Sequence, residues 1–338
     1  MRAVLDPGAV LTALKAAAEP TRLRILMLLA AGELNVKDLT RILGQSQPRI
    51  SRHLKLLAEA GLIKRLRDGS WVYFQVVDDG VRGMLVQRLL ASIDADDPQL
   101  VRDAQRWEAV KREREAAAQE FFRAHAAEWD RIRSLHVAEG EVEDAMREAL
   151  GGGPFELLVD LGTGTGRCLE LFADTYTRGL GLDMNHTMLA YARGKLDAAH
   201  LAAAQVRHGD IYHLALGEGS ADAVVMHQVL HFLSEPAHAV REAARILAPG
   251  GRLLIVDFAP HDLEFLRESF AHERLGFPSA TVSEWLADSG LDPVSVRELK
   301  PSISGNGDKL TVTLWLARRP DAPARDKRAK TPSMEVIG

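Results

Sequence analysis

The feature that most restricts the fold of this 338-residue chain is an alternation of strand-like and helical segments between residues 157 and 256. Alternation of this kind is typical of a parallel sheet with helices on both faces. The strand-like segments are 157–161, 178–183, 206–208, 223–227 and 252–258, and the helical ones are 166–174, 187–198 and 236–247. We therefore expect an α/β domain after the glycine-rich break at 151–154, with residues 310–317 as a final edge strand.

A glycine-rich loop follows the first predicted strand and opens the first helix of this domain. Its sequence is Asp160-Leu161-Gly162-Thr163-Gly164-Thr165-Gly166. Glycines at such a turn let the backbone approach a ligand closely. Asp183 ends the next predicted strand, where a carboxylate can hold two ribose hydroxyls. The order of loop and acid predicts a nucleotide-cofactor pocket, for which a nicotinamide cofactor is a competing interpretation.

The first 95 residues have a different pattern, in which three short helices precede two strands. Helices are expected at 22–31, at 36–43 and after Ser46, and the spacing of Ile50, Leu54 and Leu57 predicts a buried face on the third. Strand-like segments flank Asp68-Gly69, a strong hairpin signal. This order predicts a winged helix-turn-helix that binds DNA. Residues 1–95 also carry 14 Lys and Arg against 9 Asp and Glu, although the whole chain has a net charge of −5, and a basic domain suits a polyanion.

The third helix is the expected recognition helix, because its outward face is polar. A helix in the major groove reads bases with such side chains, and Arg and Gln can make bidentate contacts to base edges. Lys55, Arg65 and Arg67 are expected to meet phosphates, whereas Tyr73 either contacts DNA or packs. The predicted DNA-binding residues are Ser46, Gln47, Arg49, Ser51, Arg52, Lys55, Arg65, Arg67 and Tyr73.

The segments at 45–57 and 60–63 resemble the recognition helix and following turn of ArsR-type repressors. The resemblance covers residues 10–95 and implies a homodimer on double-stranded operator DNA. It assigns the apolar helices at 9–18 and 80–93 to the dimer face, although the second could instead pack within its own domain. Many ArsR-type proteins sense metals through cysteines, but Asn35 and Lys37 stand at the matching positions and Cys168 is the only cysteine. No metal site is therefore expected.

The second domain resembles the class I S-adenosylmethionine-dependent methyltransferases, especially the branch near the ubiquinone and menaquinone biosynthesis enzymes. The matching segments are 159–166, 181–184, 209–211, 225–232 and 247–252. The resemblance implies S-adenosylmethionine or S-adenosylhomocysteine as ligand and favours it over a nicotinamide cofactor. The implied cofactor-binding residues are Asp160, Gly162, Thr163, Gly164 and Gly166 at the amino-acid end, Asp183 at the ribose, Met184, Asp210 and Ile211 at the adenine, and His227 and Gln228 beside the sulfonium.

Three histidines are candidate catalytic bases, should methyl transfer require a proton to be removed from the acceptor. They are His227, His231 and His261. The competing interpretation is that they line the pocket or cap a helix. Trp129 and Asp130 resemble an aromatic–acid pair that closes over the cofactor, although Trp129 could simply pack.

The sequence predicts four segments. They are a winged helix-turn-helix domain at 1–95, a helical linker and cofactor lid at 96–153, a methyltransferase-like domain with a seven-stranded Rossmann-like sheet at 154–319, and a disordered tail at 320–338. No apolar run is long enough to span a bilayer and no signal pattern begins the chain. We therefore expect a cytoplasmic protein.

Two functions follow from this combination of domains. The first is a transcriptional regulator, expected to be a repressor, whose DNA binding responds to S-adenosylmethionine or S-adenosylhomocysteine; related fused regulators are associated with methionine-cycle genes. The second is an active methyltransferase for a small-molecule acceptor, with an autoregulatory DNA-binding domain. Arsenite methylation is disfavoured because a lone cysteine cannot bind the metalloid. Nucleic-acid methylation is disfavoured because 227–230 lacks the Asn/Asp-Pro-Pro-Tyr type of motif.

Overall fold

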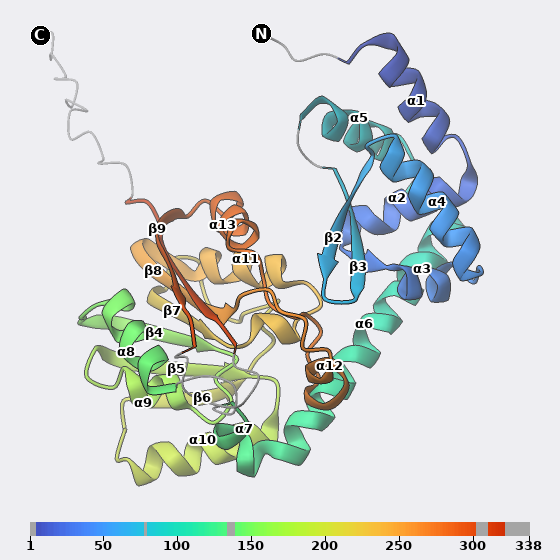
Figure 1. Ribbon diagram of the computed structural model, residues 1–338. Helices are drawn as coiled ribbons and strands as arrows, with labels where there is room; N and C mark the ends of the chain where they lie inside the picture. Colours follow the sequence, from blue (N-terminus) through green and yellow to red (C-terminus); the bar gives the residue numbers. More distant parts are fainter. Residues whose placement is uncertain (1–4, 78–79, 134–138, 302–309, 322–338) are drawn as a thin grey trace, which may run out of the picture.

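The computed structural model describes residues 5–77, 80–133, 139–301 and 310–321. It places an N-terminal helical domain beside an α/β domain, and one long helix runs from the first to the second (Figure 1). Most of the predicted disordered tail lies outside the described residues. Among the described residues, no helix is both long and apolar enough to cross a membrane.

The N-terminal domain has five helices and a small antiparallel sheet with strand order β1-β3-β2. Its elements are α1 (Pro7–Ala17), α2 (Pro20–Ala31), β1 (Leu34–Asn35), α3 (Val36–Leu43), α4 (Gln47–Glu59), β2 (Ile63–Asp68), β3 (Trp71–Val76) and α5 (Gly80–Ala91). Ile50, Leu54 and Leu57 of α4 are buried, as their spacing predicts. The predicted winged helix-turn-helix is therefore confirmed, with β2 and β3 as its wing.

The connecting region is a series of helices rather than one continuous helix. Its elements are α6 (Pro98–His125), the short 3-10 helix η1 (Ala126–Glu128), α7 (Trp129–Arg133) and α8 (Glu139–Leu150). Trp107 and Val110 of α6 are buried in the core of the N-terminal domain. At 1.5 Å per residue, the 28 residues of α6 extend about 42 Å. This length carries α6 from the N-terminal core to the second domain (Figure 1).

The second domain is built on a seven-stranded sheet with strand order β6-β5-β4-β7-β8-β10-β9. Its strands are β4 (Phe155–Leu161), β5 (Tyr176–Asp183), β6 (Ala204–His208), β7 (Ala221–His227), β8 (Leu247–Phe258), β9 (Asp292–Leu299) and β10 (Val312–Arg318). Its helices are α9 (Arg167–Leu171), α10 (His186–Ala198), η2 (Leu230–Phe232), α11 (Pro236–Ile246), α12 (Phe265–Phe270) and α13 (Ser279–Asp288). The first five strands of the order are parallel, so their carboxyl ends share one edge.

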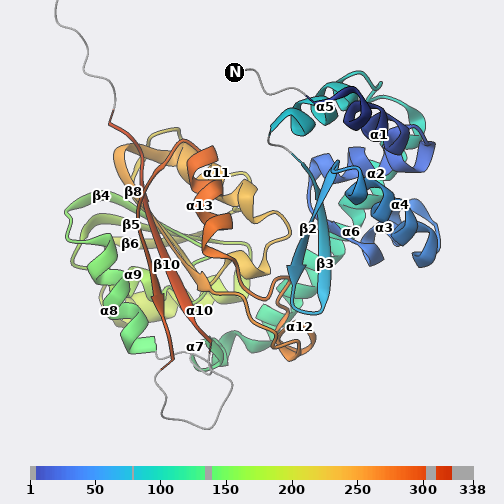
Figure 2. The same ribbon diagram turned by 45° about the horizontal axis from the view of Figure 1, so that its top comes forward.

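Helices cover both faces of this sheet, as predicted. One face packs against α8, α9 and α10 through residues such as Leu158 and Val225, and the other packs against α11 and α13 through residues such as Val224 and Ile255. Figure 2 shows α8 and α13 on opposite sides of the strands. Successive residues of β4, such as Leu158 and Val159, point to opposite faces of the sheet, so one strand contributes to both hydrophobic cores.

The final strand predicted at 310–317 is present as β10, but the prediction that it lies at the edge of the sheet was wrong. β10 lies between β8 and β9 and is antiparallel to both, so its side chains are mostly buried. The edge strand is β9, whose sequence reads Asp-Pro-Val-Ser-Val-Arg-Glu-Leu and whose residues are exposed except at the last position. Val294 and Val296 alternate with Ser295 and Arg297, but this run is short and follows Pro293, and both valines are exposed, so β9 gave only a weak sequence signal.

Candidate cofactor pocket and DNA-binding face

The glycine loop forms the floor of a pocket at the carboxyl ends of the parallel strands. The N–H groups of Gly162 and Thr163 both donate to the Leu182 carbonyl, at 2.9 and 3.0 Å, and so tie the loop to β5. Gly162 has a φ of +72°, and a Cβ there would lie 2.4 Å from Cγ2 of Val229. A side chain at this position would therefore collide with the opposite wall, and the loop needs glycine.

Asp183 joins the end of β5 to the same loop. One carboxylate oxygen accepts the Gly164 N–H at 2.9 Å, and the other accepts the Asn185 N–H at 2.8 Å. Burial raises the pKa of Asp183, while these backbone hydrogen bonds oppose the shift. The carboxylate is thus held by the loop on one side and by the start of α10 on the other.

Most of the predicted cofactor-binding residues meet in this pocket. Those that line it are Asp160, Gly162, Thr163, Gly164, Asp183, Met184, Ile211, His227 and Gln228. Gly166 instead begins α9 in a left-handed conformation. Asp210 accepts the Tyr212 N–H at 2.9 Å and lies 3.3 Å from His213, between the lining residues Gly209 and Ile211.

The pocket is also lined by residues that were not predicted individually from the sequence, several of them in the segment 96–153 that was expected to be a cofactor lid. Glu115, Gln119 and Phe122 of α6 line it, together with Phe232 of η2. Phe122 packs edge-to-face on Phe232, with ring centroids 4.8 Å apart. The aromatic residues of a charged helix were the available signal for this wall, but nothing in the sequence indicates which strand edge α6 crosses.

Trp129 and Asp130 are positioned against the glycine loop. Trp129 lines the pocket and packs edge-to-face on Phe122, with ring centroids 5.2 Å apart. Asp130 accepts the Thr165 hydroxyl at 2.6 Å and pairs with Lys195 at 2.8 Å. The start of α7 is therefore attached both to the loop and to α10.

The three candidate catalytic histidines occupy different surroundings. His227 lines the pocket, where its Nδ1 lies 3.6 Å from Sγ of Cys168. His231 is buried, and its Nδ1 lies 2.8 Å from the carboxylate of Asp257. His261 follows β8 and is not among the residues that line the pocket. Of the three, His227 is therefore the one that the structure places at the cofactor pocket.

The neutral state of His261 makes stability depend on pH. Burial lowers the pKa of His261 to about 4, and His231 acts in the same direction. The unfolded chain, with a His pKa of about 6.5, takes up a proton first as the pH falls. The contribution of His261 is therefore complete above pH 6.5 and is lost as the pH falls toward 4.

We expect His261→Asn to flatten this part of the pH profile, because an Asn oxygen can still accept the Leu263 N–H that now bonds to Nδ1 at 3.3 Å. The measurement is the urea midpoint of unfolding for both proteins between pH 7.5 and 4.5. Parallel profiles would contradict the assignment.

The recognition helix presents its polar face to solvent. Ser46, Gln47, Arg49, Ser51, Arg52 and Lys55 are all exposed. Figures 1 and 2 both place α4 on the side of its domain away from the α/β sheet. Arg65 and Arg67 of the wing are also exposed. The exposed face of α4 is therefore directed away from the second domain.

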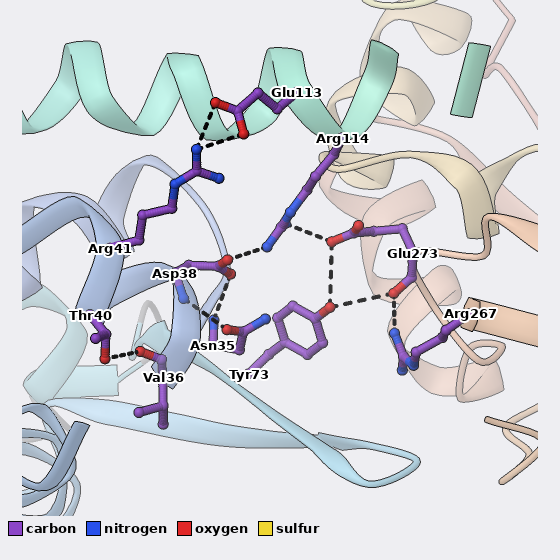
Figure 3. Close-up of polar contacts among 10 residues, drawn as sticks. All are labelled: Asn35, Val36, Asp38, Thr40, Arg41, Tyr73, Glu113, Arg114, Arg267 and Glu273. Atoms are coloured by element: carbon purple, nitrogen blue, oxygen red, sulfur yellow. Dashed lines mark hydrogen bonds and ion pairs between the residues drawn. The ribbon is translucent and has the colours of Figure 1, made fainter. Parts of the chain in front are cut away.

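Tyr73 is placed differently from the other predicted DNA-binding residues. It is fully buried, and its hydroxyl lies 3.4 Å from Oε1 of Glu273 in the second domain. Figure 3 shows the ring between β3 and the segment that carries Glu273. In this arrangement Tyr73 packs and does not reach a phosphate, which is the alternative that the sequence left open.

Within the described ranges, no three His, Cys, Asp or Glu side chains are grouped so that they could hold a metal ion. The matched cysteine positions of metal-sensing relatives carry Asn35 and Lys37, and Asn35 caps α3 through a hydrogen bond to the Asp38 N–H. Asn35 therefore has a structural function in the helix-turn-helix.

Comparisons with known proteins divide the chain in the same way. The family model described as "Bacterial regulatory protein, arsR family" matches residues 19–65, and the one described as "Methyltransferase domain" matches residues 159–255. The arsenic resistance transcriptional regulator ArsR1 of Pseudomonas putida is 41% identical over 107 residues, which are 31% of this chain and 80% of that protein.

Two further relatives match less of their own length. An uncharacterized 37.1 kDa protein in transposon TN4556 of Streptomyces fradiae is 37% identical over 116 residues, and the match covers 33% of each chain. The demethylmenaquinone methyltransferase of Deinococcus radiodurans is 33% identical over 155 residues, which are 44% of this chain and 64% of that enzyme. This chain thus spans a third of the first protein and less than two thirds of the second.

Proposed function

Because the chain belongs to the arsR family through its N-terminal domain and carries a class I S-adenosylmethionine-dependent methyltransferase domain, we propose that it is a cofactor-responsive transcriptional regulator. Its α4 would read operator DNA, and S-adenosylmethionine or S-adenosylhomocysteine in the pocket would change its affinity for that DNA. Repression is the expected sign of regulation.

The pocket fits such a ligand in shape and in chemistry. The left-handed glycines 162 and 164 bring backbone without side chains to its floor, and the partly buried Asp183 carboxylate offers acceptors at the strand end. Asp160 and the loop would hold the amino-acid end, Asp183 the ribose, and Met184 with Ile211 the adenine. S-adenosylmethionine supplies, when bound, a methyl group activated by its sulfonium.

The observation that carries the proposal is the double placement of α6. The same helix buries Trp107 and Val110 in the DNA-binding domain and lines the cofactor pocket with Glu115, Gln119 and Phe122. A ligand that contacts this helix thus touches an element of the DNA-binding core. Allostery requires such differential contacts in two states of the protein.

The direct test is a fluorescence-anisotropy titration of a fragment of its own promoter at fixed salt. S-adenosylmethionine and S-adenosylhomocysteine are added in separate experiments. A ligand-dependent change in DNA affinity supports the proposal and identifies the effector. Tight DNA binding that ignores both ligands would contradict it.

We expect Arg52→Ala to weaken operator binding about 10- to 100-fold, because a bidentate contact to a base contributes about 1–3 kcal/mol. Arg52 is exposed on α4 and lies far from the cofactor pocket, so ligand binding measured by calorimetry should be unchanged. Arg102→Ala, which removes an exposed arginine of α6, is the control and should leave DNA affinity unaltered. If both substitutions weakened DNA binding equally, the assignment of α4 to the DNA interface would be contradicted.

Homodimerisation is part of the proposal. Leu11 and Leu14 of α1 and Met84 of α5 are large apolar side chains exposed to 56%, 43% and 50%. A second copy that covers these helices would bring two recognition helices to one operator. Sedimentation analysis at micromolar concentration tests this. The methionine-cycle target genes and the cytoplasmic location stay predictions.

The second candidate function, methyl transfer to a small-molecule acceptor, is favoured by His227. Its ring is buried at the pocket and lies at the end of β7, where it can take a proton from the small molecule that receives the methyl group. Incubation with S-adenosylmethionine and panels of candidate acceptors, followed by detection of S-adenosylhomocysteine, tests this. Cofactor binding without turnover would contradict methyl transfer and would leave regulation as the only one of the two functions that is supported.

A further inference from the structure

The tip of the wing is bound by the second domain. One carboxylate oxygen of Asp68 accepts the Leu275 N–H at 2.9 Å and lies 2.9 Å from the Arg267 guanidinium. The Ser70 N–H donates to Oε1 of Glu264 at 2.6 Å. Both sides of the hairpin turn are therefore engaged by the segment at 264–275. A wing tip that is held against protein in this way cannot also approach a DNA backbone.

The strand behind the tip is held as firmly. The guanidinium of Arg274 lies 3.8 Å from the centroid of the Tyr73 ring, and it pairs with Glu33 at 2.8 Å. The Tyr73 hydroxyl lies 3.4 Å from Glu273. Tyr73 and Arg274 are 0% and 6% exposed, so this contact between the domains excludes water. Burial raises the pKa of Tyr73 and keeps the hydroxyl protonated.

Arg114 of α6 extends the contact to the helix-turn-helix itself. Its guanidinium lies 2.6 Å from Glu273 and also pairs with Asp38 of α3 (Figure 3). Asp38 caps its own helix, because its side chain accepts the Asn35 N–H at 3.2 Å. The helix that precedes α4 is therefore tied, through Arg114, to the same glutamate that contacts the wing.

Both partners of this contact are carried by elements that line the cofactor pocket. Glu115, the residue after Arg114, lines the pocket from α6. Beside α6, Phe232 lines the pocket from η2, and the carbonyl of the preceding His231 accepts the N–H groups of Glu273 and Arg274 at 2.9 and 3.0 Å. A ligand in the pocket therefore packs against α6, which carries Arg114, and against η2, which holds the backbone of Glu273.

We propose that these contacts form a wing latch, which withholds the wing from DNA and which ligand in the pocket keeps closed. The wing latch consists of Asp68, Ser70 and Tyr73 of the wing, Arg114 of α6, and Glu264, Arg267, Glu273, Arg274 and Leu275 of the second domain. The inference rests on the proposed function and adds the direction of the ligand effect: bound cofactor lowers the affinity for DNA. By linkage, DNA weakens cofactor binding by the same factor.

The test weakens the wing latch by substitution and measures the number of phosphate contacts from the salt dependence of DNA binding. Each phosphate neutralised by a protein cation adds about 0.9 to the slope of log K against log salt on duplex DNA. With the wing released, Arg65 and Arg67 can each reach a phosphate. We expect full-length Glu273→Gln to bind mixed-sequence duplex DNA several-fold more tightly at low salt, with a slope steeper by about 2 per chain. Mixed-sequence DNA makes this measurement independent of the operator.

The chain offers a matched control for Glu273→Gln in a second ion pair between α6 and α3. Glu113 precedes Arg114 on α6 and also pairs with a residue of α3, Arg41, at 2.6 Å, but the two side chains are 59% and 55% exposed. Glu113→Gln removes the same charge as Glu273→Gln, but from an ion pair between α6 and α3 that does not touch the wing. It should therefore leave the slope unchanged. Glu264→Gln, which weakens the bond to the Ser70 N–H, should steepen the slope as Glu273→Gln does.

Saturating S-adenosylhomocysteine completes the experiment. In the natural protein it should weaken DNA binding and flatten the slope, and in Glu273→Gln this effect should shrink several-fold. Slopes that are equal in Glu273→Gln, Glu264→Gln and Glu113→Gln would overturn the latch. So would a ligand that tightens DNA binding. Steeper slopes without any ligand effect in the natural protein would instead support the latch and contradict the proposed function, and calorimetric ligand binding verifies that each variant is folded.

Discussion

Replacement of Asp183 by alanine is expected to weaken binding of S-adenosylmethionine about 100-fold. The Asp183 carboxylate accepts hydrogen bonds from the Gly164 and Asn185 N–H groups and is the partly buried acid at the proposed ribose position. A hydrogen bond to a charged group contributes about 1.5–3 kcal/mol, and about 2.7 kcal/mol corresponds to 100-fold in affinity. The substitution removes a ligand contact and also frees Gly164, so both effects act in one direction. Isothermal titration calorimetry measures the change.

Asp222→Ala is the matched control for this substitution. Asp222 is also an acid of the same domain that accepts a backbone N–H, that of Leu157 at 2.9 Å, but it lies at the other end of the strands. Its loss should leave ligand affinity within about two-fold, since it makes no contact with the pocket. If Asp183→Ala kept the affinity of the natural protein, the pocket would not be the cofactor site. If it lost ligand binding but its DNA affinity still responded to ligand, the regulatory proposal would fail.

Replacement of Gly276 by alanine is expected to lower the free energy of unfolding of the second domain by about 3 kcal/mol. Gly276 has a φ of +83°, a conformation that costs a residue with a side chain about 1–2 kcal/mol. A Cβ there would also lie 2.2 Å from the Ala259 carbonyl oxygen and 2.8 Å from that of Phe258. Both obstacles are backbone atoms and cannot rotate away. In a domain of this size the loss lowers Tm by about 6–12 °C.

Two other glycines separate the causes of that loss. Gly290 has a φ of +76° with nothing within 4 Å of a Cβ, so Gly290→Ala should show the conformational cost alone. Gly217 lies outside the left-handed region and is equally open, so Gly217→Ala should change stability by less than about 0.5 kcal/mol. Differential scanning calorimetry ranks the three. Equal losses at Gly276 and Gly290 would mean that the loop moves to admit the methyl group.

The cofactor pocket could be predicted from the sequence where its residues are close to one another along the chain or end neighbouring strands. Glycine spacing fixed the loop from Gly162, and strand alternation placed Asp183 and His227 at the same sheet edge. The outward face of α4 could be predicted for the same reason, since Ile50 and Leu54 mark the buried side of a single helix. These are local patterns, and local geometry decides them.

The contacts between the domains could not be predicted in this way. Glu115 of α6 lines the pocket, and Tyr73 of the wing is buried by Arg274, about 200 residues later in the chain. An aromatic residue in a wing reads equally well as a DNA contact or as a packed side chain, and Arg267 and Glu273 read as solvated charges. Their pairing depends on the angle at which α6 leaves the first core, and this angle cannot be inferred from the spacing of residues close together in the sequence.

The length of α6 has a consequence for how such a chain can evolve. One helix serves two cores, through Trp107 and Val110 at one end and Gln119 and Phe122 at the other. A residue inserted between them would turn one set by about 100° around the axis relative to the other. Flexible linkers accept insertions freely, but this junction accepts them only in near-whole turns. Recombination that exchanges the first domain must therefore keep the number of residues between the two buried sets of α6, or change it by near-whole turns. The two domains are thus constrained to evolve together.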